Sequence, residues 1–193
     1  MISGLIDPSQ MRYKLPAKTY QKFEEARRSG LKLSDQLRIE AKVSIGYLLN
    51  DKTAEADKTL NKAAMIYAEL MKLLKDSPYL HSIGGVHVGT EEYVEACLLA
   101  DYLEGKPLRA IEDLAVNHEA YIGGLCDMSG ELLRYGRKHP EKMKQIEADL
   151  EDLHQNCLQI IVSRNNVIRK KLGDLERNTK HMEEMIYQWE LKK

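Results

Sequence analysis

Residues 121–134 read YIGGLCDMSGELLR, a helix-forming run in which acids stand among glycines and apolar residues. Asp127 and Glu131 are four residues apart, so both carboxylates share one face of the predicted helix. Acids with small and apolar neighbours are expected to be partly buried, which is costly unless they are paired or bind a cation. Each glycine weakens the helix by roughly 1 kcal/mol, so the glycines indicate close contact with another helix.

A second acidic pair precedes this run, in residues 90–96, TEEYVEA. Glu92 and Glu95 are three residues apart and also share a helical face. If the two helices pack side by side, four carboxylates converge, and they repel each other unless a cation or shared protons compensate. Oxygen ligands suit hard divalent ions such as Mg²⁺ or Mn²⁺. The pattern therefore predicts a carboxylate metal site built across two helices.

Purely structural interpretations of these acids stay open. Thr90 could be an N-cap, which would make the following acids ordinary first-turn residues. The acids of the later run could form a buried ion pair with Arg134 or Lys42. Arg38 and Lys42 lie one helical turn apart, and with Arg134 they are candidates for binding nucleic-acid phosphates.

The composition is that of an ordinary soluble, helix-rich protein. The chain has 193 residues, enough for one domain with a substantial core, and is 43% hydrophobic and 31% charged. Its 29 basic and 30 acidic residues balance, which argues against a surface-coating nucleic-acid binder. Three cysteines without CxxC spacing fit reduced intracellular thiols. Since the chain has neither an apolar run long enough to span a membrane nor an apolar signal segment, we expect a cytoplasmic protein without membrane association.

Helical periodicity predicts an all-α, single-domain bundle of six or seven helices. We expect an irregular arm at residues 1–18 and the helical domain at residues 19–193. Residues 27–30 are interpreted as an interruption of the first helix, and Gly84 and Gly85 as part of a linker. Later helices are expected at about 53–74, up to 103, 107–114, 118–138, 141–163 and 167–189.

Residues 92–96, EYVEA, and 127–134, DMSGELLR, resemble two motifs of the translin family, in its translin-associated factor X (TRAX) branch. The family motifs read EYVEA and DLTGELMR. The resemblance extends over about residues 31–134, and beyond Pro140 only the helical pattern and the length agree. It implies an all-α fold that assembles into a hollow, roughly octameric shell.

The resemblance also implies an activity. Family members bind single-stranded nucleic acid, and the TRAX branch supplies a metal-dependent endoribonuclease within the shell. Matched by position, the catalytic, metal-binding carboxylates are Glu92, Glu95 and Asp127, with Glu131 as a fourth, supporting catalytic carboxylate. Glu40 matches an acid in the family's first helix. The short N-terminal segment resembles a minimal, prokaryotic-style member that assembles with itself.

The expected function is therefore hydrolysis of single-stranded RNA within a homo-oligomer, with an octamer expected, using Mg²⁺ or Mn²⁺. A bound metal would lower the pKa of the attacking water. Because no histidine pair is available for chemistry at the 2′-hydroxyl, the expected products carry a 5′-phosphate and a 3′-hydroxyl. The alternative is a non-catalytic protein that binds single-stranded RNA or DNA, as in the translin branch. A purely structural bundle, in which the acids close internal ion pairs, is the third class.

Overall fold

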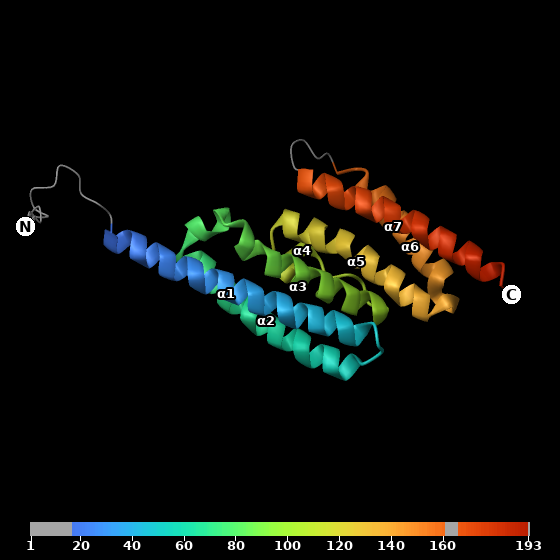
Figure 1. The fold of residues 1–193 in the computed structure, drawn as a ribbon, viewed down its shortest axis with the longest axis horizontal. Helices are drawn as coiled ribbons and strands as arrows, with labels where there is room; N and C mark the ends of the chain where they lie inside the picture. The colour runs from blue at the N-terminus through green and yellow to red at the C-terminus, as the bar shows by residue number, and fades with distance from the viewer. Residues whose placement is uncertain (1–16, 161–165, 193) are drawn as a thin grey trace, which may run out of the picture.

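A computed structural model describes residues 17–160 and 166–192, and within them the chain is an assembly of α-helices without strands (Figure 1). The predicted all-α bundle of six or seven helices is confirmed. Of the arm predicted for residues 1–18, residues 1–16 lie outside the described part of the chain. Ala17 and Lys18 already belong to the first helix, which begins at Ala17. The helices are α1 (Ala17–Leu48), α2 (Thr53–Asp76), η2 (Pro78–Ser82), α3 (Gly84–Leu103), α4 (Ile111–Leu114), α5 (His118–Lys138), η3 (Pro140–Lys142), α6 (Met143–Cys157) and α7 (Asn166–Glu190).

The long helices follow one another across the molecule. Helix α1 packs against α2 and α3, α3 packs against α5, and α5 packs against α7, which also contacts α6. Figure 1 shows α1 and α2 along one side and α6 and α7 along the other, with α3 and α5 between them. Helix α3 is buried on nearly every face, as its residues Val94, Cys97 and Leu98 illustrate. A helix that is apolar all round belongs in the interior, so the acids of α3 are carried into the centre of the molecule.

Helix α5 has clear local signals at both ends. The side chain of Asn117 accepts a hydrogen bond of 2.8 Å from the Ala120 amide, as an N-cap residue does. Two basic residues occupy its last turn, where cations stabilise the helix dipole, and Pro140 follows shortly after. The helix predicted for residues 118–138 has these bounds in the structure.

The predicted interruption at residues 27–30 and the linker at Gly84 and Gly85 are both wrong. Helix α1 runs unbroken through Gly30, and the two later glycines begin α3. Two glycines of α3 make room for α1: a β-carbon at Gly85 would lie 2.9 Å from the Leu31 side chain. At Gly89 it would lie 2.2 Å from the Ser34 carbonyl oxygen. Close contact between α1 and α3 explains these two glycines, whereas a β-carbon at Gly84 would meet nothing within 4 Å.

Two later helices are shorter than predicted. The helix expected at 107–114 is limited to α4, because the preceding loop is held by Arg109, which donates hydrogen bonds to Asp101 (Nε to Oδ2, 2.8 Å) and to the Cys97 carbonyl (3.0 Å). The segment expected at 141–163 forms η3 and α6, and its last three residues lie outside the described part. None of the described helices combines the length and apolar character needed to cross a bilayer.

Candidate functional site

The contact between α3 and α5 is made by glycines. A β-carbon at Gly124 would lie 2.8 Å from both the amide nitrogen of Glu95 and the side chain of Val94. At Gly123 it would lie 2.7 Å from the carboxylate of Glu91. The close contact predicted from the glycines is therefore present at these two positions. Gly130 differs, because its nearest neighbour, the Asn178 amide, is at an ordinary 3.6 Å.

This contact brings all four predicted carboxylates to one cavity of about 580 Å³. Helix α3 contributes the first two acids and α5 the other two, while α1 and α7 complete the wall. Thr90 is buried inside α3, so the N-cap interpretation of this segment is wrong. The charged groups that line the cavity are Glu92, Glu95, Asp127, Glu131, Asp174, Lys42, Arg134 and Arg177.

Glu95 lies deepest among these acids and is 6% exposed. Burial, and after it the charges of the neighbouring Glu92, Asp127 and Glu131, raise the pKa of its carboxyl to about 8. Within the described residues, Glu95 has no hydrogen-bonded or ion-paired partner for its side chain. The convergence of carboxylates predicted from spacing therefore adds to burial in raising the pKa of the innermost acid.

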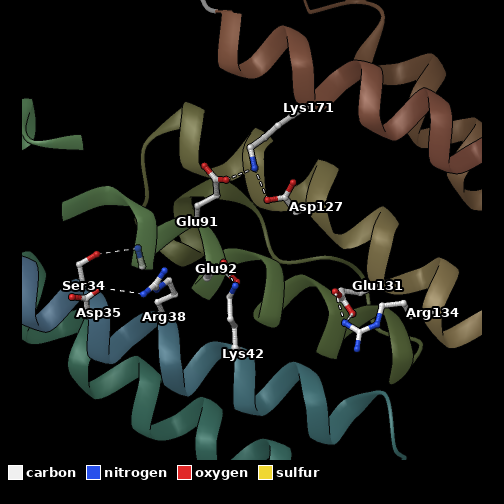
Figure 2. A network of polar contacts seen from close by, with 11 residues as sticks. Ser34, Asp35, Arg38, Lys42, Glu91, Glu92, Asp127, Glu131, Arg134 and Lys171 are labelled. Atoms are coloured by element: carbon white, nitrogen blue, oxygen red, sulfur yellow. Dashed lines mark hydrogen bonds and ion pairs between the residues drawn. The ribbon is translucent and has the colours of Figure 1, made fainter. Parts of the chain in front are cut away.

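The three outer carboxylates each meet a cation of the chain (Figure 2). Lys42 of α1 lies 2.9 Å from Glu92, and Arg134 lies 2.7 Å from Glu131. Asp127 is paired with Lys171 of α7. For the acids of residues 127–131, the structural alternative was an ion pair with Arg134 or Lys42. The pair with Arg134 is present at Glu131, whereas Lys42 pairs with Glu92 of α3.

The oxygens of these acids are not gathered as tightly as metal ligands. Among residues 17–160 and 166–192, the acids whose oxygens lie within 4.8 Å of one another are Glu147, Glu151 and Glu183, on the exposed side of α6 and α7. Ligation of one ion by Glu92, Glu95 and Asp127 would therefore require side-chain rotation that moves Glu92 away from Lys42 and Asp127 away from Lys171. The backbone already places these acids around one cavity.

Sequence reasoning missed the residues that α7 brings to the site. Lys171 pairs with both Glu91 and Asp127, and Asp174 and Arg177 form a 2.8 Å pair at the cavity wall. Lys171 follows Arg169 and Lys170 in the sequence, and a basic run of this kind is typical of a solvated helix face. Glu91 was considered only as a first-turn acid. A periodic apolar stripe on α7 could have indicated that one of its faces is buried, but not which helix it meets.

Two residues singled out in the first helix do not line the cavity. Arg38 is exposed and lies 3.4 Å from Asp35, one turn earlier in α1 (Figure 2). Glu40 instead forms a 2.5 Å ion pair with Lys62 of α2. Only Lys42 among the candidates of α1 therefore lines the carboxylate cavity, together with Arg134 from α5.

The fold and the site define a class of protein: an all-α bundle with an acidic cavity where four helices meet. The chain belongs to the translin family, whose family model matches residues 17–193. It is 26% identical over 190 residues to the translin-associated protein X homolog of Schizosaccharomyces pombe, covering 86% of this chain and 82% of that protein. The family inferred from the two motifs is thereby confirmed.

Solved structures show the same fold. The chain matches apo-NeC3PO with a TM-score of 0.83 and 26% identity, over 91% of this chain and 98% of that one. It matches AfC3PO, in a structure of its complex with duplex RNA, with a TM-score of 0.77 and 22% identity, over 92% and 95% of the two chains. The second match shows the fold alone.

Proposed function

We propose that this protein is a divalent-metal-dependent endoribonuclease that cleaves single-stranded RNA inside a homo-oligomer. The observation that carries the proposal is the convergence of Glu92, Glu95, Asp127 and Glu131 on one cavity, around a carboxyl buried deeply enough to hold its proton near neutral pH. Buried, mutually repelling acids reduce stability, and they are typical of functional sites. Their place on two tightly packed helices keeps them fixed relative to each other.

The donor set fits Mg²⁺ or Mn²⁺. The predicted ligands Glu92, Glu95 and Asp127 offer only carboxylate oxygens, which these hard ions prefer. Excess negative charge around Glu95 is the electrostatic environment that a divalent cation would relieve. When bound, such an ion supplies an activated water and neutralises charge that develops on the phosphate.

The chain's own residues have separate tasks in this proposal. Glu131, which is paired with Arg134 before RNA binds, places a carboxylate beside the predicted ligands. The side chains of Lys42 and Arg134 are 59% and 61% exposed, so they can swing from their acids to RNA phosphates. No described residue that lines the cavity is a histidine, which favours hydrolysis to a 5′-phosphate over transfer to the 2′-hydroxyl.

Support for RNA comes from the relatives. AfC3PO forms a complex with duplex RNA, and we propose that this chain binds RNA as a single strand within an assembly of its own copies. Non-catalytic binding of single-stranded RNA or DNA is the second candidate function. It is favoured by the ion pairs that Lys42, Lys171 and Arg134 make with three of the acids.

The test is cleavage of a labelled single-stranded RNA in Mn²⁺, in Mg²⁺ and in EDTA. Wild type should cut only with metal, and Glu95→Gln and Asp127→Asn should each lose about 100-fold or more of the rate. Glu176→Gln is the matched control, because this acid is paired with Lys180 on the exposed side of α7. If the RNA is bound but not cut, the result contradicts the nuclease and supports the non-catalytic binding protein. If Glu95→Gln and Asp127→Asn both still cut the RNA, the catalytic residues lie outside the carboxylate cavity.

A further inference from the structure

Lys171 differs from the other cations of the site in being half-buried. Its side chain is 17% exposed, against 59% for Lys42. It extends from α7 and forms ion pairs with Glu91 of α3 and Asp127 of α5 at the same time (Figure 2). One ammonium group thus ties together three helices that are distant in the sequence.

The two carboxylates that share Lys171 face different spaces. Asp127 lines the carboxylate cavity, whereas Glu91 lines a neighbouring cavity of about 600 Å³ with His81 and His87. The position of Glu91 is built into the fold, since the missing β-carbon of Gly123 leaves room for its carboxylate. Glu91 is therefore an acceptor for Lys171 outside the predicted set of metal ligands.

A divalent ion and an ammonium group compete for the same carboxylate. With both held at Asp127, their positive charges would repel each other at close range, in surroundings where burial weakens solvent screening. Lys42 and Arg134 can leave their acids for water. Lys171 is largely shielded from water and is already paired with Glu91, so that carboxylate is the acceptor it retains when it leaves Asp127.

We propose that Glu91 and Lys171 form a counter-ion latch that sets the affinity of the site for a divalent ion. Lys171 holds Asp127 when no divalent ion is bound, and it transfers to Glu91 alone when an ion takes Asp127. Glu91 is thus a positioning residue that lies outside the ligand set yet favours metal binding. This inference rests on the proposed function, because it takes Asp127 as a metal ligand.

The test is calorimetric titration of the full-length, assembled protein with MnCl₂ alone, without RNA. The relevant signal is the binding that Asp127→Asn abolishes, which separates this site from the exposed acids of α6 and α7. Lys171→Met should tighten this binding by about 10-fold, and Glu91→Gln should weaken it by about 10-fold, as for other residues that orient metal ligands. In the Lys171→Met background, Glu91→Gln should change the affinity by less than about 2-fold, because the latch is already open.

Arg177→Gln is the matched control, since it removes another cation of the same region whose partner is Asp174. An equal tightening by Arg177→Gln would overturn the latch in favour of a general charge effect. Additive effects of the two latch variants would overturn it as well. If Lys171→Met binds Mn²⁺ with the same affinity as wild type, the latch is rejected and the metal site is retained. An absence of Asp127-dependent binding in both wild type and Lys171→Met rejects the proposed function together with the latch.

Discussion

Gly124 lies directly against the backbone of Glu95, so close that a β-carbon at Gly124 would be 2.8 Å from the Glu95 amide nitrogen. This contact sets the separation of α3 and α5. It therefore also sets the separation of the acids that the two helices carry. The first prediction follows from it.

Gly124→Ala should lower the free energy of unfolding by about 1–3 kcal/mol, because the added methyl group forces two packed helices apart. Gly173→Ala is the control: this glycine is inside α7, and a β-carbon there would meet nothing within 4 Å. It should raise stability by up to about 1 kcal/mol, as a glycine replaced within a helix does. Urea unfolding monitored by circular dichroism measures both. Equal effects of the two substitutions would contradict the tight contact at Gly124.

The second prediction concerns pH and stability without metal. Burial first, and then neighbouring acids, raise the pKa of Glu95 from 4.5 to about 8. Between these values the folded protein retains a proton that the unfolded chain releases, so the free energy of unfolding falls as pH rises through this window and levels off above it. Unfolding in EDTA at a series of pH values should show this fall in wild type. Glu95→Gln should remove that part of the slope, and an unchanged slope would show that Glu95 ionises freely.

The third prediction separates the basic residues of α1. Lys42 lines the carboxylate cavity, whereas Arg38 lies outside it beside Asp35. In EDTA, Lys42→Met should weaken binding of a single-stranded RNA. It should also reduce the slope of log binding constant against log salt concentration by the equivalent of about one phosphate contact. Arg38→Met, which removes a similar charge one turn away, should change either quantity less. Fluorescence anisotropy over a range of salt concentrations compares them, and a larger effect of Arg38→Met would place the RNA outside the cavity.

The fourth prediction concerns the ends of the RNA products. Because the cavity is lined by carboxylates and no described lining residue is a histidine, water is the expected nucleophile. Each cut should leave a 5′-phosphate and a 3′-hydroxyl. Mass spectrometry of the products distinguishes these ends from a 2′,3′-cyclic phosphate, whose appearance would contradict hydrolysis.

Features that depend on neighbours in the sequence were predicted well. The bounds of α5 follow from Asn117 at one end and from the basic last turn and Pro140 at the other, all of which act within a few residues. The pairing of acids on one face of α3 and on one face of α5 follows from helical periodicity alone. The same local reasoning failed at Gly30 and Gly85, which resemble helix breakers yet lie within helices, Gly85 because α3 packs closely against Leu31 of α1.

Local pattern and long-range packing thus account for different parts of the site. The helical spacing already places two acids together on α3 and two on α5. It does not reveal that Lys171, 44 residues beyond Asp127, forms ion pairs with an acid of each of these helices. Nor does it reveal that Glu95 is the acid that keeps its proton. Both depend on distances between helices and on exclusion of water, and those arise only when α1, α3, α5 and α7 pack together, since Coulomb energy and desolvation depend on separation in space rather than along the chain.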